Sequence, residues 1–177
     1  LAAEGLIELL PNRGARVRQL SQRDLEELFD VMAGLESLAG RLACEAITDE
    51  EIIGIERLHY EMYGHYLHRD MHGYFQVNQQ IHESIVAAAR NDTLKTAYAN
   101  FAGRIRRVRY SANFARKRQR WAEAMREHEA ILDALRRRAG NELADILFQH
   151  LRNKRSAAIE HLAEGQDDAP EATPHDR

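Results

Sequence analysis

The chain has 177 residues, of which 44% are hydrophobic and 30% charged, and its formal net charge is −3. This length provides one well-filled core and is too short for two full domains, and the near-neutral charge excludes a general attraction to nucleic acid or membranes. Only three prolines and ten glycines interrupt the chain, which favours a mostly helical soluble domain. No apolar run reaches the length of a membrane span, and the single cysteine, Cys44, excludes an internal disulfide and indicates a reducing, cytoplasmic setting.

The first eighteen residues differ from the rest of the chain. Residues 1–5 are predicted to be a helix end, and Leu6–Leu10 can pair with Ala15–Arg18 as a β-hairpin. Because these pieces have no core of their own, residues 1–18 are expected to be the remnant of a domain whose larger part lies upstream. Three arginines of this segment suit phosphate contacts, although surface arginines are also common without that role. They are Arg13, Arg16 and Arg18.

Six helical segments are predicted after this remnant, several with a recognisable cap. Ser21, Thr48 and Asp70 are candidate N-caps, and Thr48 opens a capping box with Glu51. The segments cover 21–47, 48–68, 70–90, 91 through 108, 121–138 and 141–163. Short connections between long amphipathic helices favour an all-α antiparallel bundle of six to seven helices in residues 21–164. The polar composition of residues 165–177 predicts a disordered tail.

Three histidines and an asparagine occupy positions that helical spacing assigns to the bundle core. Asn78 and His82 lie four residues apart on an apolar stripe of the third segment, and His128 and His150 have core spacing on the fifth and sixth. A buried imidazole needs partners for its nitrogens, so several in one core indicate either a hydrogen-bonded network or a shared cation. A single inward histidine is more often a satisfied core residue, and spacing alone does not establish that the three helices meet.

Several stretches occur in a recognisable order. Residues 1–17 are followed by the helix 25–46 with its Leu35-Glu36 pair, and later come Asn78-x3-His82, Glu127-His128-Glu129-Ala130-Ile131-Leu132 and His150-Leu151. In this order they resemble the FadR-type (FCD) ligand-binding domain of the GntR family of bacterial transcription regulators, preceded by the end of the family's winged helix-turn-helix with its hairpin wing. The resemblance implies the effector-sensing domain of a homodimeric regulator that binds operator DNA through its N-terminal domain.

The resemblance also implies a divalent metal site. In the family an aspartate and three histidines bind the cation, and a small carboxylate effector binds on or beside it. The corresponding ligands are Asn78, His82, His128 and His150, with zinc as the leading expectation and nickel or manganese as alternatives. Asparagine in place of aspartate leaves a divalent ion with about +2 instead of about +1 across its protein ligands, which weakens metal retention and strengthens the pull on an anion. The alternative is that Asn78 marks a site that no longer holds metal.

A second departure concerns the capture of the carboxylate. Many family members have an arginine near the effector on the first FCD helix, where this chain has Met32. The fourth helical segment then becomes the candidate source of positive charge. Its candidate effector-binding residues are Arg104, Arg107 and Arg109, although most of the basic run that contains them is expected to be a solvated face.

Two other functions stay open at this stage. A zinc-dependent hydrolytic enzyme could use three histidines and an open coordination position, but the glutamates that flank the histidines in sequence, Glu83, Glu127 and Glu129, point about 100° away on their helices. We therefore predict that the chain is not an enzyme.

A metal-free structural helical oligomer would instead use the histidines as hydrogen-bonding core residues. The denser cluster His59, His65, His68 and His72 is interpreted as a surface turn.

Dimerisation is expected from the family resemblance and from the two-fold symmetry of typical operators. Three apolar residues of the first helix are candidates for the contact, although core packing explains them equally well. They are Leu25, Phe29 and Met32.

Overall fold

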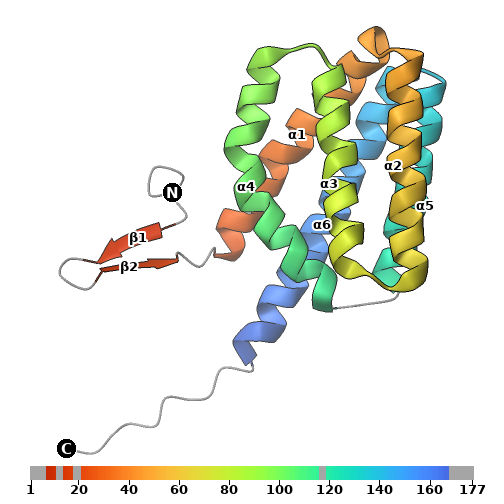
Figure 1. The fold of residues 1–177 in the computed structure, drawn as a ribbon. Coiled ribbons are helices and arrows are strands. Elements are labelled where there is room, and N and C mark those ends of the chain that lie inside the picture. Colours follow the sequence, from red (N-terminus) through yellow and green to blue (C-terminus); the bar gives the residue numbers. More distant parts are fainter. Residues whose placement is uncertain (1–6, 11–13, 18–20, 116–118, 168–177) are drawn as a thin grey trace, which may run out of the picture.

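The molecule is a bundle of long helices (Figure 1). The computed structural model describes residues 7–10, 14–17, 21–115 and 119–167, with side chains at 21–103 and 121–160. The helices are α1 (Gln22–Ala46), α2 (Asp49–His68), α3 (Met71–Ala88), α4 (Asp92–Ala115), α5 (Gln119–Arg136) and α6 (Gly140–Asp167). From α2 onward, each helix runs opposite to the one before it. This arrangement confirms the predicted all-α bundle.

A two-stranded hairpin precedes the helices. Strand β1 (Ile7–Leu10) pairs antiparallel with β2 (Gly14–Val17), with Ile7 opposite Val17 and Leu10 opposite Gly14. The strands lie within one residue of the predicted positions. Their identity as the wing of a winged helix-turn-helix stays a prediction.

Local side-chain hydrogen bonds set the first boundaries of the bundle. Ser21 Oγ accepts from the Asp24 amide at 3.1 Å while Asp24 Oδ2 accepts from the Ser21 amide at 3.0 Å, and Thr48 and Glu51 form the same reciprocal box before α2. Asp70 Oδ1 accepts from the Gly73 amide at 3.1 Å, and this hydrogen bond lowers the pKa of the Asp70 carboxyl. The three predicted N-caps are therefore confirmed, because each satisfies amides that a helix start leaves unpaired.

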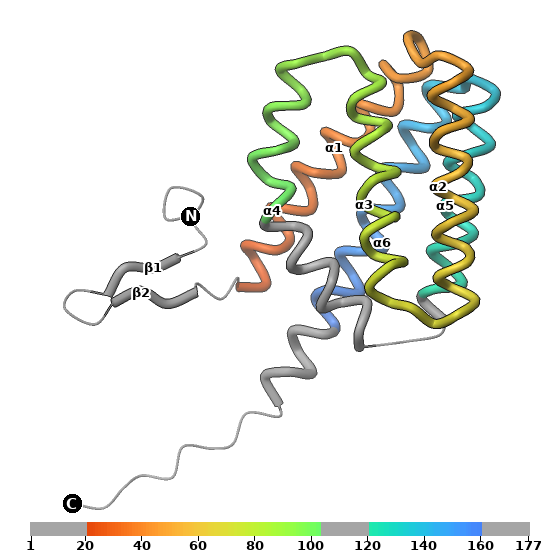
Figure 2. Tube along the Cα trace, viewed as in Figure 1, coloured from red at the N-terminus to blue at the C-terminus, as the bar shows by residue number. Residues whose placement is uncertain are grey.

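The core is built around α1, which packs against α3, α4 and α6, while α2 packs against α3 and α5 (Figure 2). Gly40 marks the close approach of α1 to α6. A Cβ atom at this position would lie 2.6 Å from Leu147 Cδ1 and 3.0 Å from Leu143 Cγ. Glycine therefore lets the two helices pack more closely than alanine would allow.

The ends of α5 and α6 differ from the prediction. Helix α5 ends at Arg136, before the expected residue 138, because Arg138 adopts a left-handed conformation with φ 53°. The Arg138 guanidinium donates to the Ile47 carbonyl and to Asp49, so a contact with a distant segment accompanies this turn. Helix α6 continues to Asp167, beyond the expected end at 163, and residues 168–177 of the predicted tail lie outside the described residues.

Burial decides the role of the three apolar candidates for the dimer contact. Leu25, Phe29 and Met32 are at most 1% exposed and belong to the core between α1, α4 and α6. Core packing therefore explains them, and the predicted alternative that they contact a second subunit is wrong.

Among the described residues, no helix has both the length and the apolar character needed to cross a bilayer.

Candidate metal centre

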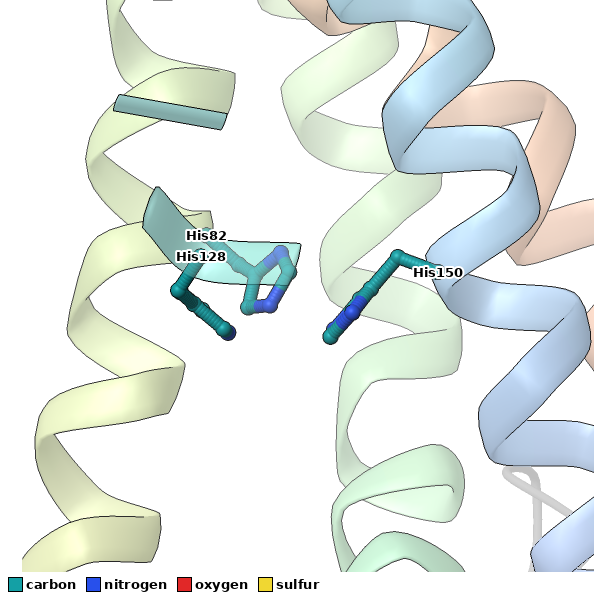
Figure 3. Close-up of side chains that lie close together, drawn as sticks. All are labelled: His82, His128 and His150. Carbon is teal, nitrogen blue, oxygen red and sulfur yellow. The ribbon is translucent and has the colours of Figure 1, made fainter. Parts of the chain in front are cut away.

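Three imidazoles meet in the middle of the bundle (Figure 3). His82 comes from α3, His128 from α5 and His150 from α6, and each is only 1% exposed. Their ring centroids are 5.1 to 5.3 Å apart, and one nitrogen from each ring lies within 4.8 Å of the other two. Within the described part of the chain, no other group of three or more His, Cys, Asp or Glu side chains is placed to share an ion.

Two carboxylates contact imidazoles of this cluster. The Nδ1 atom of His82 lies 2.8 Å from Oε2 of Glu36 on α1, and Glu36 is itself only 1% exposed. The Nδ1 atom of His150 hydrogen-bonds to Oε2 of Glu127 at 2.6 Å. A carboxylate that faces Nδ1 favours the tautomer with the proton on that nitrogen, so that Nε2 keeps its lone pair for a ligand. In this tautomer, Nε2 of His82 and Nε2 of His150 each keep a lone pair that a ligand could use.

The third imidazole, His128, is held neutral by its surroundings. Burial lowers its pKa well below the ordinary value, and the neighbouring His150 and His82 lower it further. Neither of its ring nitrogens has a hydrogen-bond partner. A neutral imidazole has one nitrogen with a free lone pair, which is the form that binds a metal ion.

Asn78 adds a further acceptor on α3, one turn before His82. The residue is 4% exposed, and its Oδ1 atom has no hydrogen-bond partner. A buried acceptor without a partner costs about 1–3 kcal/mol, so a core rarely retains several of them without compensation. Imidazole nitrogens with an amide oxygen form a donor set suited to borderline divalent ions. The residues present therefore fit a cation.

The predicted site residues fall into two groups. His82, His128 and His150 lie together, and Asn78 is buried one turn before His82 on α3. The predicted effector and DNA contacts cannot be placed: the side chains of Arg104, Arg107 and Arg109 in α4, and of Arg13, Arg16 and Arg18, lie outside the described residues. Met32 is fully buried one turn before Glu36, so the α1 position that carries an arginine in many family members is apolar here.

The sequence interpretation missed the two carboxylates. The helical angle between Glu127 and His128 describes one helix only, whereas the partners of Glu127 lie on α6. Its Oε2 pairs with His150 Nδ1, and its Oε1 accepts from Asn153 Nδ2 at 2.6 Å. Glu36 carried a usable signal, because it lies at core spacing in α1, one turn after Met32 and one turn before Gly40. The spacing criterion applied to the histidines would also have selected this glutamate.

The denser histidine cluster is not a metal group among the described residues. His65 Nδ1 pairs with Asp70 Oδ2 at 2.8 Å, and His68 Nδ1 pairs with the Gly64 carbonyl at 2.8 Å. The interpretation as a surface turn is wrong for His59, which is 8% exposed between α2 and α5, and burial lowers its pKa.

Comparisons with known proteins identify the family and agree with the fold. The chain belongs to the FCD domain family, which matches residues 27–153. It is 32% identical over 177 residues to a protein of Paenarthrobacter nicotinovorans described as "Probable D-xylose utilization operon transcriptional repressor", covering 98% of this chain and 74% of that relative. It is 23% identical over 152 residues to the HTH-type transcriptional repressor RspR of Escherichia coli K12, covering 85% of this chain and 65% of RspR.

Solved structures show the same fold. E. coli McbR/YncC superposes with a TM-score of 0.83 at 16% identity, covering 90% of this chain and 79% of that one. A GntR-family regulator from Pseudomonas syringae superposes with a TM-score of 0.69 at 18% identity, covering 92% and 67%. The family match and the 32% identical repressor, together with this fold, show that the chain carries the regulatory domain of a GntR-family transcriptional regulator. These relatives are regulators and not enzymes, which decides against the hydrolytic alternative.

Proposed function

We propose that this domain senses a small carboxylate metabolite through a divalent cation in the bundle core, and that this binding modulates the DNA affinity of a dimeric regulator. The observation that carries the proposal is the convergence of three buried imidazoles, two of which face carboxylates through Nδ1. His82, His128, His150 and Asn78 hold the ion, which is zinc in the first instance, with nickel or manganese as alternatives. A bound ion of this kind supplies a positive charge that attracts an anion.

The charge of the donor set supports a carboxylate as the effector. None of the four protein donors brings a negative charge, because three are imidazoles and Asn78 replaces an acidic ligand. The carboxylates of Glu36 and Glu127 partly offset a divalent charge. They contact the Nδ1 atoms of His82 and His150, however, and are not themselves ligands of the proposed ion. An anionic effector then provides the charge that an aspartate would otherwise provide, and Arg104, Arg107 and Arg109 are its proposed cationic partners.

The regulatory step is a shift between two bundle arrangements. Effector that binds one arrangement more tightly raises its population, and the change in the bundle repositions the DNA-binding domains of the dimer. In the full-length regulator, Arg13, Arg16 and Arg18 contact operator phosphates from the wing. Because the coupling is reciprocal, operator DNA changes effector affinity by the same factor.

Calorimetric titration of the full chain tests the metal and the carboxylate together. Zinc is titrated into metal-free protein, and acetate is then titrated into zinc-loaded and metal-free protein. Saturable zinc binding, with acetate bound only by the zinc-loaded form, is the expected result. Acetate binding that does not depend on zinc, or no zinc binding, refutes the metal-dependent mode of sensing. For the full-length regulator, an operator affinity that is unchanged at saturating effector refutes the sensor role.

A further inference from the structure

A line of buried polar atoms without partners leads away from the histidines along α3. Tyr74, Asn78 and His82 are spaced four residues apart, so they lie on one stripe of the helix. Tyr74 is fully buried and Asn78 is 4% exposed, and neither Tyr74 Oη nor Asn78 Oδ1 has a hydrogen-bond partner. The stripe continues the polar character of the site for two turns toward the start of α3.

Helix α5 contributes a third such atom beside this stripe. Trp121 stacks on Tyr74, with ring centroids 5.2 Å apart and an interplanar angle of 8°. Trp121 is 6% exposed, and its Nε1 atom is buried without a hydrogen-bond partner. Tyr74 precedes His82 by two turns on α3, and Trp121 precedes His128 by two turns on α5. Because Tyr74 pairs with Trp121 and His82 with His128, the N-terminal ends of α3 and α5 lie together.

These three atoms are costly unless something binds them. A buried donor or acceptor without a partner costs about 1–3 kcal/mol, and native cores contain few. Phenylalanine or leucine would fill the same space without that cost. The Tyr74 phenol also remains protonated, because burial and the negative charge of Glu127 raise its pKa. A core that served packing alone has no use for a phenol, an amide oxygen and an indole N–H without partners.

We infer that Tyr74, Asn78 and Trp121 form a subsite for the part of the effector beyond its carboxylate, and that this part is a carbon chain bearing hydroxyl groups. The inference rests on the function proposed above. Asn78 Oδ1 has a second lone pair that accepts while the first binds the ion, Trp121 Nε1 only donates and the phenol does both, and hydroxyl groups can serve all three. The rise of α3 places Asn78 about 6 Å and Tyr74 about 12 Å from His82 along the axis, which suits a chain of roughly five or six carbons.

Three carboxylates of equal charge test the subsite on the zinc-loaded full chain. D-gluconate and n-hexanoate have the same number of carbons and differ in their hydroxyl groups, and acetate is the carboxylate alone. Gluconate is expected to bind about tenfold or more tightly than hexanoate, because hexanoate leaves the Tyr74 hydroxyl and the Trp121 N–H unpaired. Trp121 is the single tryptophan of the chain, so its fluorescence is expected to change on adding gluconate and to stay constant on adding acetate.

A matched pair of variants assigns the effect to the phenol oxygen. Tyr74→Phe keeps the ring that stacks on Trp121 and removes only Oη, and it is expected to weaken gluconate binding about five- to tenfold while zinc and acetate affinities stay unchanged. Tyr66→Phe is the control, because its ring also contacts Trp121 but its hydroxyl is not among the buried unpartnered atoms. This control is expected to bind gluconate as the wild type does.

Two results overturn the inference in distinguishable ways. Equal affinities for gluconate and hexanoate without a tryptophan response, while zinc and acetate still bind, mean that water occupies the polar positions; the proposed function then survives and the subsite does not. Failure of the wild type to bind zinc and acetate refutes both. If Tyr74→Phe does not fold, the comparison of gluconate with hexanoate and the fluorescence of the wild type still decide the question.

Discussion

Replacing Glu127 by glutamine tests how the second carboxylate supports the site, because the change keeps the side chain's shape and removes its charge. In the wild type both oxygens accept: Oε2 from His150 Nδ1 at 2.6 Å and Oε1 from Asn153 Nδ2 at 2.6 Å. Glutamine has one oxygen and one amino group, so one of these two donors must lose its acceptor. The change therefore disturbs the side chain that holds His150, one of the proposed metal ligands.

The size of the effect follows from two independent considerations. Loss of a carboxylate behind a metal-binding histidine lowers metal affinity about 10–100-fold, which corresponds to about 1.4–2.7 kcal/mol. A hydrogen bond to a charged group contributes about 1.5–3 kcal/mol, a range that overlaps the first. We therefore expect the zinc dissociation constant of Glu127→Gln to rise about 10–100-fold.

Competition with a chromophoric zinc chelator at pH 7 measures this change. Glu129→Gln is the matched control, because it removes the same charge from the same helix at an exposed position two residues away. The control is expected to retain wild-type affinity. A Glu127→Gln protein that binds zinc within about twofold of the wild type, or an equal loss in the control, would refute the role assigned to this carboxylate.

Three further changes probe the site, the packing and the pH response. Asn78→Asp adds a negative charge to the donor set and is expected to tighten zinc binding about tenfold or more in the same competition assay. Gly40→Ala places a Cβ 2.6 Å from Leu147 Cδ1 and is expected to lower the free energy of unfolding by about 1–3 kcal/mol in urea, with zinc affinity unchanged. His59→Gln is expected to flatten the pH dependence of stability of the metal-free protein below pH 6.5.

The sign of the His59 effect follows from its lowered folded-state pKa. Below the unfolded value of 6.5 the unfolded chain binds a proton that the folded protein does not, so stability is fully present above 6.5 and falls as the pH drops. One such group contributes a slope of at most about 1.4 kcal/mol per pH unit, and glutamine removes it. Parallel pH profiles for wild type and His59→Gln would show that this histidine does not carry the effect.

The other two predictions also have clear contrary results. Zinc affinity that is unchanged in Asn78→Asp would mean that residue 78 does not reach the ion. Unfolding of Gly40→Ala at the urea concentration of the wild type would mean that α1 and α6 have room to relax around Leu147.

Local patterns were sufficient to predict most of the fold. The caps at Ser21, Thr48 and Asp70 depend on residues within one turn, so their hydrogen bonds could be predicted from spacing alone. The end of α5 could not, because Arg138 turns the chain in a left-handed conformation and contacts Ile47 and Asp49 on another segment. Helix boundaries that depend on tertiary contacts cannot be predicted from a local sequence pattern.

The same distinction holds for the site. The three histidines were visible because each occupies a core position of its own helix. The partners of Glu127 could not be predicted, because a helical angle describes neighbours on one helix and its partners lie on α6. Glu36 could have been predicted from its core spacing in α1, because a buried carboxylate on an apolar stripe needs a partner as much as an imidazole does.

Elemental analysis of the untagged full chain, after dialysis against metal-free buffer, tests the central claim most directly. The wild type and the exposed-histidine control His72→Ala are expected to retain about one divalent ion per chain. His128→Ala is expected to lose it, because His128 is one of the three imidazoles that would hold the ion. An ion that remains in His128→Ala, or a wild type that takes up neither zinc nor nickel when these are added, would contradict the metal centre.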